Sequence, residues 1–214
     1  MWFQNRRKSN QIFPDDLCFG DTINSSPINA PFSDVPTQVI RGYQLLHLYR
    51  SWRETHSVKF VGDAHGAFLE PYIFEFTWPR ARFVPFKDWY SPWKYDYTVH
   101  RYADAIWSDQ AEDIMLELFK SVDGVLYDAG SLVDFIIQDL LGYPTSEWHQ
   151  FLDFGKQNMV CSVVCRAAEV KAYEETLASG PARRPGGSKI HIERTPPALL
   201  HDHCTYLDLG SLAV

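Results

Sequence analysis

Short apolar runs bounded by turn residues recur along the first half of the chain, and this pattern is typical of β-strands. In several of them apolar and polar residues alternate, as in a strand with one buried face. The predicted strands are Leu17 to Asn24, His56 to Val61, Pro71 to Thr77, Ala81 to Pro85 and Tyr97 to Tyr102.

A second pattern places apolar residues three and four positions apart, which predicts amphipathic helices. These helices are expected at Thr37 to Arg53, Asp109 to Val122, Gly130 to Leu141 and Asn158 to Thr176. We find no internal repeat and no change of composition that marks a linker. The mixture predicts one α+β domain at residues 17–207, with tails at residues 1–16 and 208–214.

Composition narrows the class of protein. The chain has 214 residues, 45% hydrophobic and 22% charged, which is enough apolar material for a globular core. The net charge of −7 argues against generic nucleic-acid binding, which needs a basic face. No apolar run is long enough for a transmembrane helix, and no apolar leader is visible. We therefore expect a cytoplasmic protein, with export by another route or a virion location as alternatives.

The four cysteines do not have the spacing of a disulfide framework, and Cys161 has the best position for chemistry. It opens an apolar helix, where unpaired N–H groups and the helix dipole favour a thiolate. Cysteine is also a common small buried residue, and this is the competing interpretation. Cys165 lies one turn further along and is expected to be an inert core residue.

His56 and Glu75 are the candidate partners of such a thiol. His56 begins a predicted strand, and a histidine on a strand that faces a helix N-terminus suits a general base. Glu75 lies among apolar neighbours, where an unpaired carboxylate is costly. A histidine partner would offset that cost, and so would a salt bridge to Arg80 or Arg82.

The order of these motifs resembles that of circularly permuted, NlpC-type papain-like cysteine hydrolases, a superfamily that includes lecithin-retinol-acyltransferase-like enzymes. The likeness covers roughly residues 17–207. The motifs are Gly20-Asp21, Thr55 to Asp63, Ile73 to Phe76, Val99-His100-Arg101, Gly124 to Asp128, Cys161-Ser162 and Thr195 to Leu199. Two positions depart from the pattern: Val163 replaces a common Glu, and Lys59 replaces a small or apolar residue.

The resemblance implies a papain-like fold in which an antiparallel sheet packs against helices. It also implies a thiol hydrolase of the peptidase or amidase kind, with Cys161 as nucleophile, His56 as base and Glu75 as the residue that orients His56. Its reaction would pass through an acyl-enzyme without a cofactor. Peptides, peptidoglycan peptides and lipid esters are the implied substrates. The aromatic stretch Phe86 to Tyr97 either lines a substrate groove or forms a packed loop.

Two other functions compete with this interpretation. The first is a catalytically inactive member of the same fold that serves as a binding or structural protein, for example in a phage or bacterial assembly. The second is a metal protein, because His201, Asp202, His203 and Cys204 form a dense cluster of ligand types near His191. A polar terminal loop explains that cluster equally well, and the expected site contains no metal.

Overall fold

The computed structural model describes residues 12–29, 31, 35–46, 53–102, 107–127, 129–144, 160–177 and 206–208. Within this part of the chain, six strands form one antiparallel sheet in the order β4-β3-β2-β1-β5-β6. The strands are β1 (Thr22–Pro27), β2 (His56–Gly62), β3 (Tyr72–Phe76), β4 (Ala81–Pro85), β5 (Tyr95–Tyr102) and β6 (Tyr206–Asp208). The helices are η1 (Pro14–Asp16), α1 (Val35–Leu46), α2 (Phe86–Trp89), α3 (Asp109–Val122), α4 (Ala129–Leu140) and α5 (Cys161–Thr176).

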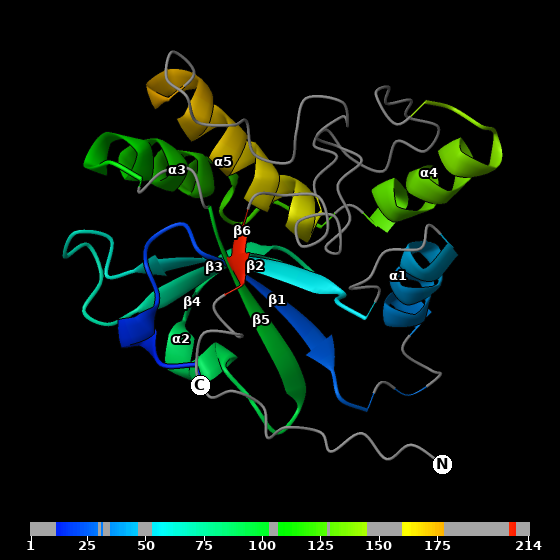
Figure 1. Cartoon of the computed structure of the whole chain (residues 1–214), viewed down its shortest axis with the longest axis horizontal. Helices are drawn as coiled ribbons and strands as arrows, with labels where there is room; N and C mark the ends of the chain where they lie inside the picture. Colours follow the sequence, from blue (N-terminus) through cyan, green and yellow to red (C-terminus); the bar gives the residue numbers. More distant parts are fainter. Residues whose placement is uncertain are drawn as a thin grey trace.

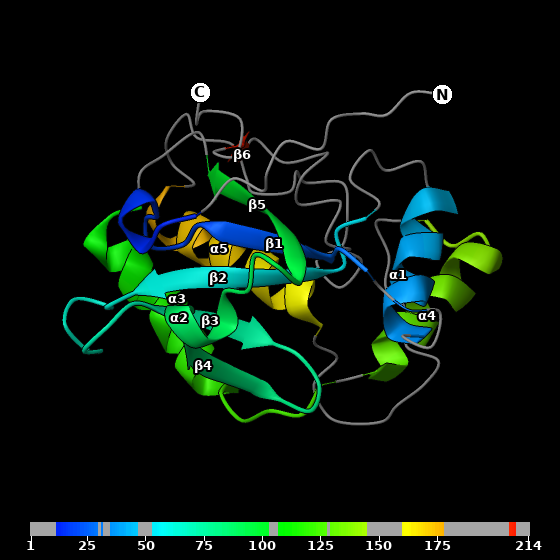
Figure 2. The ribbon, with the colours of Figure 1, turned by 90° about the horizontal axis from the view of Figure 1, so that it is seen from below.

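The helices cover the sheet unequally. α3 and α5 lie together on one face, while the short α2 lies on the other (Figure 1). α1 and α4 lie beyond the end of the sheet at which β2 begins, and α5 also begins at that end (Figure 2). The predicted α+β class, with an antiparallel sheet packed against helices, is confirmed.

Alternation along the strands divides the core between the two faces of the sheet. On the α3 and α5 face, Phe74 and Phe76 of β3 pack with buried residues of both helices. On the opposite face, Val58 and Phe60 of β2 pack with Ile73 and with Phe86 of α2. Side chains on both faces of the central strands are therefore packed against other parts of the protein.

The first predicted strand begins too early in the sequence. The backbone turns at Gly20, which has a φ of +83°, and β1 starts only at Thr22. The Asp21 carboxylate stabilises this turn by accepting from the N–H of Cys18 at 2.8 Å and from Arg101 of β5 at 2.8 and 2.9 Å. The Asp21 carboxylate thus ties the turn before β1 to β5.

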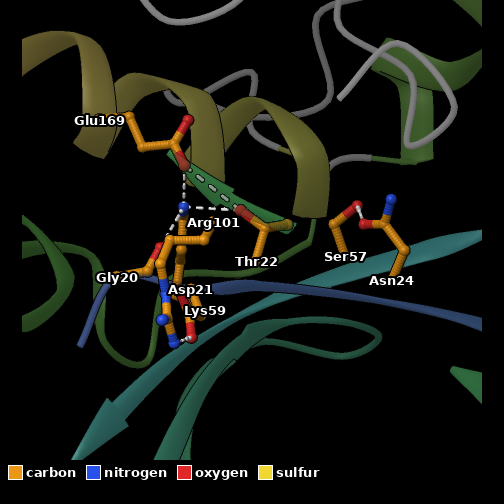
Figure 3. A network of polar contacts seen from close by, with 8 residues as sticks. All are labelled: Gly20, Asp21, Thr22, Asn24, Ser57, Lys59, Arg101 and Glu169. Carbon is orange, nitrogen blue, oxygen red and sulfur yellow. Dashed lines mark hydrogen bonds and ion pairs between the residues drawn. The ribbon is translucent and has the colours of Figure 1, made fainter. Parts of the chain in front are cut away.

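A buried ion pair joins α5 to the centre of the sheet. Lys59 of β2 and Glu169 of α5 are both fully buried and bond to each other (Figure 3). The Lys59 ammonium also donates to the Gly20 carbonyl at 2.8 Å and to the Thr22 hydroxyl at 2.7 Å, so all three of its protons have an acceptor. Lys59 is therefore part of the contact between helix and sheet.

This ion pair fixes how far α5 lies along β2. Lys59 is three residues beyond His56 on the strand, a distance of about 10 Å. Glu169 is eight residues beyond Cys161 on the helix, a distance of about 12 Å. Because the two spans match, joining Lys59 to Glu169 brings Cys161 level with His56.

Breaking this pair on one side should be costly. We expect Lys59→Met to lower the free energy of unfolding by about 3–5 kcal/mol, because it removes the ammonium that bonds to the buried Glu169 carboxylate. Lys59→Met combined with Glu169→Leu should recover much of that loss, since neither charge of the pair remains. Urea denaturation followed by tryptophan fluorescence measures both variants, with Lys171→Met on the exposed face of α5 as the control. A double variant no more stable than Lys59→Met would contradict this account.

Candidate active site

Cys161 is the first residue of α5. It follows Val160, which has extended backbone (φ −118°, ψ 165°) and offers no side-chain cap. The first N–H groups of a helix have no partner within it, and here the N–H of Ser162 points to the Cys161 sulfur. The N–H of Ser57 on β2 donates to the same sulfur. These two donors favour the charged form of the thiol.

His56 is the first residue of β2, and its imidazole is hydrogen-bonded to Cys161. Burial alone would lower the pKa of His56, but the Cys161 thiolate and the Glu75 carboxylate together raise it to about 10. Burial would likewise raise the pKa of Cys161, but the imidazolium and the two N–H donors lower it below the ordinary thiol value. Each group therefore stabilises the charged form of the other, which favours a thiolate–imidazolium pair.

Glu75 lies on β3, opposite Val58 and diagonally across from His56 on the same face of the sheet. Its Oε2 is 3.6 Å from Nε2 of His56, while its Oε1 accepts from Nε of Arg82 at 2.7 Å. Burial would raise the pKa of Glu75, but His56 and Arg82 lower it. Glu75 thus has both of the partners that the sequence offered as alternatives, and the arginine is Arg82.

A cavity of about 590 Å³ opens beside these three side chains. This volume falls in the range that holds a drug-sized ligand. Its lining includes α1 and aromatic residues from α2 and β5, together with Cys161, His56 and Glu75. The lining residues are Ser25, Pro27, Thr37, Ile40, Thr55, His56, Glu75, Thr77, Trp78, Arg82, Val84, Asp88, Trp89, Tyr95, Tyr97, Tyr127 and Cys161.

The aromatic stretch contributes to both of the structures expected for it. Trp89, Tyr95 and Tyr97 line the cavity, whereas Phe86 and Tyr90 stack on each other with centroids 5.3 Å apart. The ring centroids of Tyr90 and Tyr97 are 4.9 Å apart, so the packed rings also contact the cavity wall. The wall of the cavity is therefore supported by a packed aromatic cluster.

Two other cysteines, Cys165 and Cys18, do not line this cavity. Cys165 is buried, and burial raises its pKa, as expected of an inert core residue. Cys18 is exposed. The His201 to Cys204 cluster and His191 lie outside the described residues. Within the described ranges, no group of three or more His, Cys, Asp or Glu side chains is arranged to hold a metal ion.

Some residues of the site were not found from the sequence. Arg82 is opposite Glu75 in the β3–β4 register, and an explicit hairpin alignment would have separated it from Arg80. Tyr127 and the α1 residues that line the cavity carry no such signal, because helices and loops approach the sheet through tertiary packing.

No helix in the described part of the chain has the length and apolar character needed to cross a bilayer.

The chain was compared with known proteins. No family model matches it, and no curated protein matches it. Among solved structures it is similar to metalloprotein yiiX from Escherichia coli O157:H7, described as DUF1105, with 15% sequence identity and a TM-score of 0.43. The alignment covers 89% of this chain and 95% of that one.

The interaction between Cys161 and His56 predicts how fast Cys161 is alkylated at neutral pH. We expect iodoacetamide to alkylate Cys161 rapidly at neutral pH, because the pKa of the thiol is lowered. His56→Gln removes the imidazolium, so the pKa of Cys161 should rise and the rate at neutral pH should fall by about tenfold or more. Mass spectrometry of the peptide that contains Cys161 measures the rate.

His65→Gln is the matched control, since His65 is a half-exposed histidine paired with Glu112 away from the cavity. In this control, Cys161 should be alkylated at the same rate as in the wild type. Equal alkylation rates for His56→Gln and the wild type would show that His56 does not lower the pKa of Cys161.

Proposed function

We propose that the protein is a cysteine hydrolase of the papain type, which acts on an amide or ester through Cys161, His56 and Glu75. The observation that carries the proposal is the hydrogen-bonded Cys161–His56 pair at the tip of α5, which lines a cavity of ligand size. The resemblance of the motif order to permuted papain-like hydrolases supports the same reaction.

The first half of the reaction forms an acyl-enzyme. The Cys161 thiolate attacks the substrate carbonyl carbon, a C–S bond forms, and the carbonyl electron pair moves to oxygen. Backbone N–H groups at the start of α5, with that of Cys161 first among them, are the donors for this oxyanion. When the intermediate collapses, the bond to the leaving group breaks, and the amine or alcohol takes the proton from His56.

The second half regenerates the enzyme. His56, now neutral, removes a proton from water, which attacks the thioester carbonyl and releases the acid and the Cys161 thiolate. Glu75 keeps its charge because its pKa is lowered, and it stabilises the imidazolium that forms in each half. Another acceptor in place of water would make the protein an acyltransferase. Peptides, peptidoglycan peptides and lipid esters are the proposed substrate classes.

A binding role without catalysis is the second candidate, and the burial of the thiol favours it. Cys161 is only 4% exposed, so a substrate carbonyl must reach the sulfur through the cavity. Val163, where the family commonly has Glu, is also buried. The hydrolase and the binding protein differ in one property that can be measured. Only in the hydrolase should Cys161 react with a substrate-like electrophile.

A labelling experiment separates them. In a Cys18→Ala background, which removes the exposed thiol, a thiol-directed acyloxymethyl ketone should label Cys161. Cys161→Ala should abolish this labelling, and Cys165→Ala should keep it, because Cys165 is a neutral core thiol. Peptide mass spectrometry locates the label. Equal labelling of the Cys161→Ala variant would remove Cys161 from the proposed role.

A further inference from the structure

Arg82 occupies an unusual place beside the candidate triad. It is the second residue of the edge strand β4, its side chain is 56% exposed, and it lines the cavity. Its Nε and one terminal nitrogen both lie 2.7 Å from the same atom, Oε1 of Glu75. Charge-assisted bonds of this length are among the stronger polar interactions in proteins, so Arg82 holds one side of the carboxylate firmly.

The second carboxylate oxygen of Glu75 lies near His56 but beyond hydrogen-bond distance. Oε2 of Glu75 is 3.6 Å from Nε2 of His56, which is an ion-pair distance and longer than a hydrogen bond. The Nε2 atom is buried and has no hydrogen-bond partner. Because Oε1 is bound twice by Arg82, a movement of Glu75 toward His56 must either carry the Arg82 side chain with it or give up those bonds.

We propose that Arg82 is a positioning residue of this site, which holds Glu75 at ion-pair distance from His56 and so limits how strongly the carboxylate stabilises the imidazolium. This inference rests on the proposed function. A hydrolase needs His56 to accept and return a proton in each turnover, and an imidazolium that is stabilised too strongly returns it slowly. Restraining Glu75 keeps the proton on His56 easier to release.

Other titratable and charged side chains surround His56 and Glu75, and a test of Arg82 must separate its effect on His56 from theirs. The titratable and charged side chains that line the cavity are His56 of β2, Glu75 of β3, Arg82 of β4, Asp88 of α2, Tyr95 and Tyr97 of β5, Tyr127 after α3, and Cys161 of α5. Arg82 acts on His56 either through Glu75 or directly as a positive charge, and a double-mutant cycle distinguishes these routes.

The experiment follows the imidazole of His56 itself by NMR of protein labelled with ¹⁵N-histidine, with His56→Gln used to assign the signal. In Arg82→Gln, Glu75 is free to approach Nε2, so the pH at which His56 loses its proton should rise by about one unit. Arg82→Met removes the same charge and should give the same shift. Arg80→Gln removes a positive charge outside the cavity lining and is the matched control.

The decisive comparison is made in a Glu75→Gln background. There Arg82→Gln should shift the His56 midpoint no more than Arg80→Gln does, because the carboxylate through which Arg82 acts is gone. An unchanged or lower midpoint in Arg82→Gln, or an equal shift with and without Glu75, overturns the inference. Failure of Cys161 to react with electrophiles would instead count against the proposed function, and the His56 titration would still report the coupling between Arg82 and Glu75.

Discussion

The ion pair between Lys59 and Glu169 is the constraint on which the geometry of the site depends. Lys59 and Glu169 are fully buried between a helix and a sheet, and because each stabilises the charge of the other, their contact favours one position of α5 along β2. Thr22 and the Gly20 carbonyl complete the coordination of the ammonium (Figure 3). An apolar contact at the same place would tolerate small displacements of the helix that an ion pair does not.

That position has a chemical consequence at the other end of the helix. The N-terminus of α5 meets the first residues of β2, so Cys161 receives N–H donors from both elements and a hydrogen bond from His56. In the thiolate–imidazolium state the charges alternate outward from Cys161 to His56, to Glu75 and to Arg82. Each group stabilises the charge of its neighbour, and only the Arg82 end of this row is widely open to solvent.

The sequence was informative where the signal is local. Cys161 at the start of a helix and His56 at the start of a strand both follow from hydrophobic periodicity, and Glu75 stands out as a carboxylate within an apolar run. The structure brings these three residues together. The sequence also predicted the α+β class, because strand and helix patterns are separate and regular along the chain.

The sequence was uninformative where partners are distant. Lys59 and Glu169 are 110 positions apart, and neither position reveals that the other is buried against it. The choice between Arg80 and Arg82 depends on strand register, and the turn before β1 is stabilised by the bonds that Asp21 makes with Cys18 and Arg101. In each case a tertiary contact decides between local alternatives that are otherwise equal.

The central claim is that Cys161 and His56 form a thiolate–imidazolium pair. Ultraviolet difference absorbance between the wild type and Cys161→Ser, recorded as a function of pH, reports the charge on this sulfur directly. The account predicts a thiolate signal that is already present at neutral pH and disappears on acidification. A signal that emerges only at alkaline pH, as for an isolated thiol, would contradict it.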